Sequence, residues 1–420
     1  MRTHFSPSQL TNPHLAAAEE NLRACVHCGI CTATCPTYVL LGDERDGPRG
    51  RIVMMQQMLE ENATPSPETV LHVDRCLSCL ACRSACPSSV DYARLVDAAR
   101  IHIQTRYRRP TSDRLLRWLI AKVLPRPGLM RLGLLFVPLG RFLPGRLGAM
   151  ARMGTKPKHR KSAVPAIAAT TPMRRVAIMP GCAQSVLAPE IDEAVARVLA
   201  RRGIELVPLT GAGCCGSLVH HLGRSEDAKA WARRAIEAFE QSKDCEAVLI
   251  AATGCSAYLK DLEHVFAGDP VWQPRAATFA AKTRDFLELA AAKSAAPTRR
   301  LRVAWQAPCS LQNGLKLADA GRKLLTDSGF EVVDIPEGHL CCGSAGSYSI
   351  LQPEIAGQLR ARKLGNIATL NPDVIATANI GCLHHLTGPD APAVVHLAEL
   401  IDWAEGGATP AFLETRPGPE

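Results

Sequence analysis

The sequence predicts an α/β protein whose N-terminal domain is helical and whose C-terminal half holds two tandem repeats, each built on a parallel sheet. Two cysteine runs of identical spacing lie between residues 25 and 87, and three cysteine motifs of the C-terminal half recur after a displacement of 127 residues. The chain has 420 residues, of which 47% are hydrophobic and 21% are charged. This composition excludes a disordered or fibrous protein, and the length predicts more than one domain.

Cysteine usage indicates metal or redox chemistry rather than disulfide bonds. The chain has 17 cysteines, an odd number that cannot pair completely within one chain. Residues 1–20 are polar, contain two prolines and lack the apolar segment of a secretory signal. We therefore expect a cytoplasmic protein, in which thiols stay reduced and more often bind metals.

Eight cysteines form two runs with the pattern Cys-x-x-Cys-x-x-Cys-x-x-x-Cys-Pro. This spacing is typical of two-cluster ferredoxins, in which three cysteines of a run bind one [4Fe-4S] cluster and the fourth binds the other cluster. A zinc site is disfavoured, because zinc usually takes cysteine pairs that a longer loop separates. Residues 1–105 are therefore predicted to be an α-helical ferredoxin-type domain with two clusters. The first cluster is predicted on Cys25, Cys28, Cys31 and Cys86, and the second on Cys76, Cys79, Cys82 and Cys35.

A polar loop, residues 42–51, and a short apolar helix, residues 52–59, connect the two runs. We favour the interpretation that this loop is a solvated connector. The alternative gives Arg49 or Arg51 a position facing a cluster, where a cation would raise the reduction potential by stabilising the more negative reduced form.

Residues 106–172 are predicted to be a basic, partly apolar linker. Between residues 101 and 161, fifteen Arg and Lys residues stand against one acid, Asp113. Basic and apolar residues at helical spacing fit an anionic lipid surface, a partner subunit, or a helix that packs on its own protein. The longest charge-free part, residues 132–140, is too short to span a membrane. No nucleic-acid partner is expected, because no recognition motif accompanies the charge.

The C-terminal half is predicted to contain one repeat in residues 173–297 and a second in residues 298–420. Three apolar runs in each repeat predict strands, and helical stretches separate them. Strands that alternate with helices indicate parallel sheets. The predicted strands are residues 175–179, 203–207 and 247–251 in the first repeat, and 302–305, 329–333 and 373–377 in the second.

Each predicted strand is followed by one of the repeated cysteine motifs. Ligand sites of open α/β sheets collect beyond the carboxyl ends of the strands, so four thiols of each repeat are expected to meet in one pocket. The alternative is that they are buried apolar cysteines retained by duplication, and for Cys245, which is not repeated, we favour that alternative. The candidate ligands are Cys182, Cys214, Cys215 and Cys255 in the first repeat, and Cys309, Cys341, Cys342 and Cys382 in the second.

One motif is misleading. Residues 211–216 match the G-x-G-x-x-G fingerprint of dinucleotide-binding folds. The second repeat has Leu340 where Gly213 stands, so the repeated element is Cys-Cys-Gly. We therefore expect no nicotinamide site here.

Two ferredoxin runs followed by two Cys-Cys-Gly repeats resemble the iron–sulfur subunits related to heterodisulfide reductase. Within that group, the sequence is most similar to the iron–sulfur subunits of glycolate oxidase, also called glycolate dehydrogenase. The resemblance runs over nearly the whole chain. It is carried by residues 22–38, 40–52, 74–79, 181–184, 339–346 and 377–382.

The resemblance implies a complex in which FAD-containing glycolate oxidase subunits oxidise glycolate, or D-lactate, and this subunit passes electrons towards a quinone. It further implies a cytoplasmic complex attached peripherally to the inner face of the cell membrane. The chain itself would then need no catalytic residue. The alternative is a disulfide-reducing subunit of the heterodisulfide reductase type, which would use the Cys-Cys-Gly pockets. A redox sensor is disfavoured, because no output domain is apparent.

The chain departs from part of this group at the end of each repeat. Some relatives have Cys-x-x-Cys there and bind a further iron–sulfur cluster, whereas this chain has Tyr258 and His385 at the positions of the last cysteine. One thiolate per repeat is therefore missing. Additional clusters in the repeats stay an open expectation, with His385 as an extra candidate ligand in the second.

Overall fold

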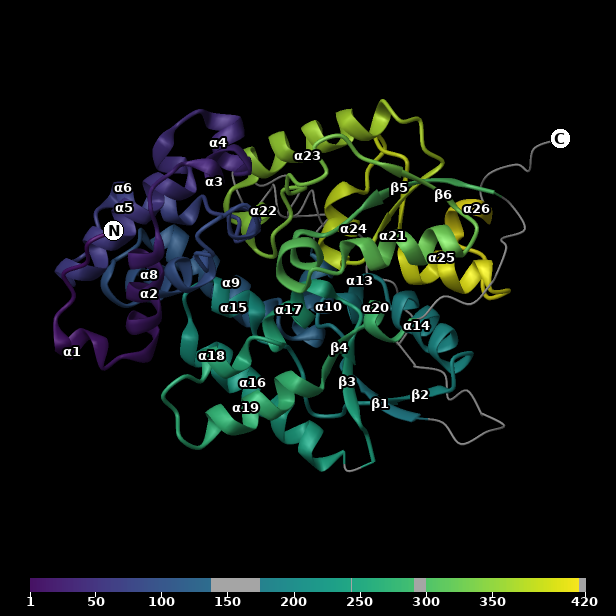
Figure 1. Ribbon diagram of the computed structural model, residues 1–420. Helices are drawn as coiled ribbons and strands as arrows, with labels where there is room; N and C mark the ends of the chain where they lie inside the picture. The colour runs from purple at the N-terminus through teal and green to yellow at the C-terminus, as the bar shows by residue number, and fades with distance from the viewer. Residues whose placement is uncertain (137–173, 243, 291–299, 415–420) are drawn as a thin grey trace.

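The computed structural model describes residues 1–136, 174–242, 244–290 and 300–414. A helical N-terminal unit lies beside two α/β units (Figure 1). Its helices α2, α5 and α8 bury apolar side chains such as Leu22, Met55 and Leu95 against one another. The elements of this unit are α1 (Pro7–Leu10), α2 (Pro13–Ala24), α3 (Ile30–Ala33), α4 (Pro36–Leu41), η1 (Glu44–Asp46), α5 (Pro48–Glu61), α6 (Pro67–Asp74), α7 (Ala81–Ser84) and α8 (Tyr92–Arg106).

Local sequence explains where these helices begin and end. Asn12 caps α2 by accepting hydrogen bonds from two backbone N–H groups, and Pro13 takes the first helical position. Helix α5 begins at Pro48, four residues earlier than the predicted helix, and ends at Glu61, where Asn62 caps it in the left-handed conformation. The segment between the cysteine runs is therefore mostly helix rather than loop.

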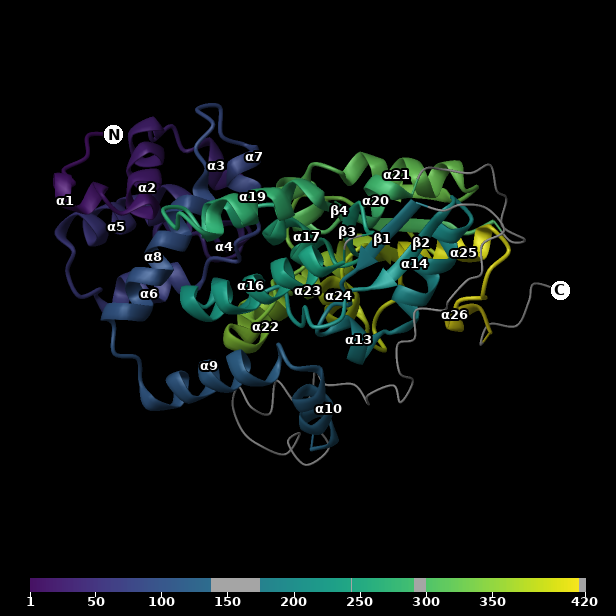
Figure 2. The same ribbon diagram turned by 90° about the horizontal axis from the view of Figure 1, so that it is seen from below.

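The basic segment contributes two helices, α9 (Thr111–Val123) and α10 (Pro127–Leu135). Figure 2 shows both along one face of the molecule, beneath α16 and α22. One side of α9, with Leu116 and Ile120, packs on residues of both repeats, including Val219 and Ile350. The rest of the predicted linker, residues 137–172, lies outside the described residues, as does the predicted repeat boundary at 297/298.

The first repeat contains a parallel sheet in the order β2-β1-β3-β4. Three strands fall where the sequence predicts them, and β4 was not predicted. The elements are β1 (Arg174–Ile178), α13 (Gln184–Leu187), α14 (Glu190–Ala200), β2 (Ile204–Pro208), α15 (Ser217–His221), α16 (Ser225–Gln241), β3 (Ala247–Ile250), α17 (Thr253–Leu259), α18 (Leu262–Val265), α19 (Trp272–Lys282), β4 (Thr283–Asp285) and α20 (Phe286–Leu289).

The second repeat has the same topology, with the parallel order β6-β5-β7-β8. The predicted fold class, a helical ferredoxin-type unit followed by tandem α/β repeats with parallel sheets, is confirmed. The elements are β5 (Arg302–Gln306), η2 (Ser310–Leu315), α21 (Ala318–Asp327), β6 (Glu331–Asp334), α22 (Tyr348–Leu351), α23 (Pro353–Ala368), β7 (Val374–Thr377), α24 (Ile380–Leu386), β8 (Ala393–His396), α25 (Leu397–Ala404) and α26 (Ala411–Glu414).

The two repeats share one apolar core. The stacked rings of Phe330 and Trp403 lie in the second repeat at the edge of this core, which continues through β1 and β3 of the first. Arg197 and Arg201 of α14 form ion pairs with Asp402 of α25. Because core and ion pairs cross between the repeats, their cysteine motifs are held in fixed relative positions.

Within the described residues, none of the helices combines the length and the low polarity that a membrane span requires.

Candidate functional site

The first cysteine run forms a loop between α2 and α3. Cys25 ends α2, and Gly29 adopts a φ of +82° that turns the loop into α3. The structure places Cys86, the last cysteine of the other run, in the same cavity as Cys25, Cys28 and Cys31. The four cysteines predicted for the first cluster therefore lie around one cavity, with Cys28 exposed at the surface. Cys82 of the second predicted set also lines this cavity, so the two sets adjoin each other.

The second run lies deeper in the molecule. Cys35, Cys76 and Cys82 are buried, and Cys35 belongs to the first run. Burial raises the pKa of both Cys79 and Cys82, and the electrostatic neighbours of each include Cys35. Cys76 is a further neighbour of Cys82, so the four cysteines predicted for the second cluster lie near one another. Their assignment to that cluster stays a prediction, because Cys31 is also a neighbour of Cys82 and Cys309 of Cys79. Eight convergent soft thiols fit two iron–sulfur clusters, since iron and sulfide are soft partners for thiolate.

Arg51 is buried beside the second group, so the solvated-connector interpretation is wrong for this residue. Its side chain is 1% exposed, and its Nη1 atom lies 3.8 Å from the Cys35 sulfur. The Nε atom donates to the His72 backbone oxygen at 2.7 Å, and Nη2 donates to Thr37 Oγ1 at 3.0 Å. The loop sequence alone suggests that Arg51 is exposed. Its contacts with residues distant in sequence explain why it is buried instead.

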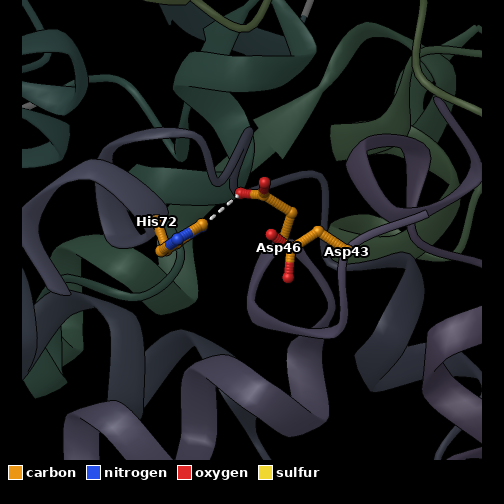
Figure 3. Close-up of side chains that lie close together, drawn as sticks. All are labelled: Asp43, Asp46 and His72. Atoms are coloured by element: carbon orange, nitrogen blue, oxygen red, sulfur yellow. Dashed lines mark hydrogen bonds and ion pairs between the residues drawn. The ribbon is translucent and has the colours of Figure 1, made fainter. Parts of the chain in front are cut away.

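The buried Asp46 carboxylate holds this arginine in place. Asp46 Oδ1 lies 3.3 Å from Arg51 and 2.9 Å from His72 Nδ1, and Oδ2 accepts from Arg75 at 2.8 Å. Figure 3 shows Asp46 and His72 facing each other, with Asp43 close by. The ligand atoms of these three residues lie within 4.8 Å of one another. Arg51 and Arg75 already neutralise Asp46. We therefore assign this group of side chains the role of positioning Arg51, rather than that of binding a cation.

Arg49 lies near the first group instead. An added Cβ at Gly29 would lie 2.6 Å from its Nη1 atom, so the guanidinium covers the first cysteine loop. Arg49 is 39% exposed and pairs with Glu44 at 2.7 Å. The two arginines of this segment therefore serve different cysteine groups, and only Arg51 is buried.

The second cysteine run packs directly on the second repeat. Cys79 and Cys309 contact the same apolar cluster, which includes Leu77 and Cys341. The Tyr348 hydroxyl of α22 donates to the Arg75 backbone oxygen at 3.0 Å. The ferredoxin-type unit thus presents its second cysteine group to the thiols of the second repeat.

The four cysteines of each repeat converge as the sequence predicts. In the first pocket, Cys214 lies 3.6 Å from Cys182, sulfur to sulfur, and Cys215 lies 3.1 Å from Cys255. Both pairs lie beyond the carboxyl ends of β1, β2 and β3. Cys245, by contrast, precedes β3 at the opposite edge of the sheet, half-buried against the core.

In the second pocket, the sulfurs of Cys342 and Cys382 lie 3.5 Å apart. Hydrogen bonds with Cys341 and Cys382 lower the pKa of Cys342 well below its ordinary value. His385 is buried next to the Cys-Cys-Gly turn, where an added Cβ at Gly343 would lie 3.0 Å from its Nε2 atom. Sequence reasoning named these residues but missed Lys363, a buried lysine of α23 near the same thiols.

The helices of the basic segment leave an apolar surface uncovered. Arg109 and Arg117 are mostly buried in ion pairs with Asp74. The outer sides of α9 and α10 expose six large apolar side chains, which we call the α9–α10 surface. They are Leu115, Trp118, Leu129, Leu132, Leu135 and Phe136.

Two family models match the chain. A 4Fe-4S dicluster domain covers residues 24–90, and a cysteine-rich domain covers residues 176–260 and again 303–387. The first match contains both ferredoxin runs, and the second contains the repeated cysteine motifs in both copies. The N-terminal unit is therefore an iron–sulfur domain of the two-cluster type.

Full-length relatives extend this assignment. The glycolate oxidase iron-sulfur subunit of Escherichia coli is 39% identical over 96% of this chain and 99% of its own length. The probable glycolate oxidase iron-sulfur subunit of Bacillus subtilis is 30% identical over 97% of this chain and 100% of its own length. Lactate utilization protein A of Exiguobacterium sp. is 29% identical over 55% of this chain and 98% of its own length. Given its cysteine groups and these full-length matches, the chain belongs to the family of glycolate oxidase iron–sulfur subunits.

Proposed function

We propose that this chain is the electron-transfer subunit of a complex in which FAD-containing partner subunits oxidise glycolate or D-lactate, and that it passes the electrons towards a quinone. The observation that carries the proposal is the convergence of eight thiols into two groups, one reaching the surface at Cys28 and one lying against the second repeat. Bound [4Fe-4S] clusters supply one-electron transfer. The names of the full-length relatives support the complex and its hydroxy-acid substrate.

The chain's own residues bind and position the redox groups. Our proposed ligand sets are Cys25, Cys28, Cys31 and Cys86 for the first cluster, and Cys76, Cys79, Cys82 and Cys35 for the second. Arg51 places a buried cation at the second set, and Asp46 orients it. No acid or base on this chain is required, because hydroxy-acid oxidation is proposed to occur on the partners.

The flavin partner is proposed to dock at the first cysteine group. Cys28 is exposed there, and Val26 and Ile30 on either side are exposed apolar side chains. Apolar contacts around an exposed ligand suit a partner that must bring its own redox group close.

Attachment to the cytoplasmic face of the cell membrane is part of the same proposal. The α9–α10 surface supplies apolar side chains, and the sequence that follows it, residues 137–161, contains seven Arg and Lys residues and no acid. Apolar groups next to concentrated positive charge suit the boundary of an anionic lipid layer. A quinone in that layer would then be the electron acceptor.

The disulfide-reducing alternative is not favoured by the relatives named above. Purification of the native complex, identification of its flavin subunits and anaerobic addition of glycolate and D-lactate test the proposal. We expect flavin to copurify and the visible absorbance of the clusters to bleach with either hydroxy acid. A protein that purifies alone, without flavin, and reduces a disulfide would overturn it.

A further inference from the structure

An ion-pair network joins α9 to the end of α6. Asp74, the last residue of α6, accepts hydrogen bonds of 2.6 Å and 3.0 Å from Arg109 and one of 2.8 Å from Arg117. The Arg117 Nε atom also donates to Asp113 at 2.9 Å. These four side chains are between 9% and 16% exposed. The network therefore lies just beneath the surface, at the N-terminal end of α9.

This network adjoins the second cysteine run. Asp74 lies two residues before Cys76, so their Cα atoms are at most about 7.6 Å apart. The backbone oxygen of Cys76 accepts a 2.6 Å hydrogen bond from Arg100, and that of Arg75 accepts one of 3.0 Å from Tyr348 of α22. Because these bonds fix the chain between α6 and the second run, α9 is held directly beside that cysteine loop.

The first cysteine group lies away from α9. In Figure 2, α9 lies along the lower side of the molecule below α6, whereas α3, which carries Cys31, lies towards the upper side. The two cysteine groups are therefore not equivalent. The first is open to a partner at Cys28, and the second adjoins α9.

The outer side of α9 offers a route for an apolar molecule. Leu115 is 58% exposed and Trp118 is 47% exposed, whereas Leu116 and Ile120 pack on the two repeats. An apolar molecule that reaches the α9–α10 surface from a lipid layer would meet the ion-pair network at the N-terminal end of the same helix.

One donor of the network has no acceptor. The Nε atom of Arg109 is buried and makes no hydrogen bond among the residues that the structure describes. A buried donor without a partner is unfavourable, so a ligand that brings a carbonyl oxygen would compensate it. The positive charge of the guanidinium would also stabilise that oxygen as it gains electron density on reduction.

We propose that a lipid-soluble quinone accepts the electrons at the N-terminal end of α9. One carbonyl oxygen binds the Arg109 guanidinium, and the apolar tail lies along Leu115 and Trp118. The quinone takes up two electrons, which the hydroxy acid supplies through the partner subunits and this chain, and two protons from water, so that both carbonyl groups become hydroxyl groups. The second cysteine group is then the exit for electrons. This inference rests on the proposed function, because it requires a chain that carries electrons away from flavin partners.

Photo-cross-linking tests the location. The purified complex on anionic vesicles is irradiated with an azidoquinone, and the labelled peptides are identified by mass spectrometry. We expect the label within residues 107–123, and we expect excess unmodified quinone to suppress it. Label that lies only elsewhere on this chain, or only on the partner subunits, would overturn the proposed site.

Substitution of Arg109 tests its role in binding. Arg109→Gln should raise the KM for quinone about tenfold, because a charge-assisted hydrogen bond is lost, and should leave the KM for glycolate unchanged. Arg109→Lys, which keeps the charge, should recover most of the loss. Arg108→Gln is the matched control, because Arg108 is the exposed neighbour, and it should behave like the wild type. A wild-type KM for quinone in Arg109→Gln would overturn the role of Arg109.

The same preparation separates this proposal from the proposed function. Quinone that reoxidises the glycolate-reduced complex but labels a different segment would overturn the α9 site and leave the electron-transfer subunit intact. Clusters that glycolate cannot reduce would overturn the proposed function itself.

Discussion

The side-chain amide of Asn313 donates a 2.9 Å hydrogen bond to the backbone oxygen of Cys79, across 234 residues of sequence. Its carbonyl oxygen accepts a 2.8 Å hydrogen bond from the hydroxyl of Ser84. One residue of η2, four positions after Cys309, therefore clamps both the loop and the short helix of the second ferredoxin run. The first repeat has Val186 at the equivalent position and cannot make this clamp.

We predict that Asn313→Val weakens the hold on the second cysteine group. The backbone oxygen of Cys79 would lose its partner, and leaving such a group unsatisfied costs about 1–3 kcal/mol. The decay of visible cluster absorbance in air should become faster. Asn366→Val is the control, because Asn366 makes a similar bond to the Pro336 oxygen away from the ferredoxin runs. Equal decay rates in the two variants would contradict the clamp.

We predict that Arg51→Gln lowers the reduction potential of the cluster held by Cys35. The buried guanidinium stabilises the more negative reduced form, and the neutral amide does not. Arg51→Lys should leave the reduction potential close to that of the wild type, because lysine keeps the positive charge. EPR-monitored redox titration measures the shift.

Arg49→Gln is the matched control for this change. Arg49 is partly exposed, pairs with Glu44 and covers the first cysteine loop, so solvent screens its charge more than that of Arg51. Arg49→Gln should shift the reduction potential of the first cluster. This shift should be smaller than the one that Arg51→Gln causes at the second cluster. A larger shift from Arg49 than from Arg51 would show that burial does not decide the effect.

We predict that Trp118→Gln combined with Phe136→Ser abolishes sedimentation with anionic vesicles. Both residues belong to the α9–α10 surface. Each substitution removes a large exposed apolar side chain, whose insertion into the lipid layer would contribute on the order of 1–2 kcal/mol. Val271→Ser, which changes an exposed apolar residue of the first repeat, is the control and should bind like the wild type. Loss of flavin partners with vesicle binding intact would make the surface a subunit interface.

Charge reversal of arginines in and next to these helices, such as Arg117 of α9 and Arg126 just before α10, is a poorer test of the same surface. Arg117 is held by Asp74 and Asp113, and the Arg126 guanidinium lies 5.4 Å from the centre of the Trp231 ring. Changing either residue to an acid would disturb packing as well as surface charge.

We predict that stability falls as the pH rises from about 4 to about 7 because of Asp192. Burial raises its pKa from 3.8 to about 7, and only Oδ1 has a partner, the Gln184 amide at 2.6 Å. The folded state keeps the proton in this window while the unfolded state releases it, so unfolding is favoured by up to roughly 4 kcal/mol above pH 7.

Asp192→Asn should remove this pH dependence, because the amide carries no charge in either state. Urea unfolding of the anaerobic protein at pH 5 and pH 8 measures the difference, with Asp319→Asn, an exposed residue of α21, as the control. The assignment would be contradicted if the difference in unfolding free energy between the wild type and Asp192→Asn were the same at pH 5 and pH 8.

Most of the C-terminal fold could be predicted because its sequence motifs recur after 127 residues. Three strands per repeat are four to five residues long and each contains valine or isoleucine, and cysteines follow them at matching places. The fourth strands were not predicted, although β8 (Ala393–His396) does contain a short apolar run. β4 is only Thr283–Asp285 and has no apolar pattern, so its pairing with β3 decides its conformation.

Roles that depend on distant contacts were missed or, for Arg51, left as the less favoured alternative. The loop around Arg51 has the composition of a solvated turn, and only its contacts with Asp46 and His72 explain its burial. The significance of Asn313 could have been found by comparing the repeats, because Val186 replaces it in the first copy. The spacing of apolar residues within a single repeat does not reveal such a role.

Freeze-quench EPR of the purified complex after anaerobic addition of glycolate tests the central claim most directly. If this chain carries electrons away from the flavin partners, signals of reduced iron–sulfur clusters must appear as the flavin is reoxidised, and Cys28→Ser and Cys79→Ser must each remove a signal. Flavin that becomes fully reduced by glycolate while the clusters of this chain stay oxidised would contradict the account.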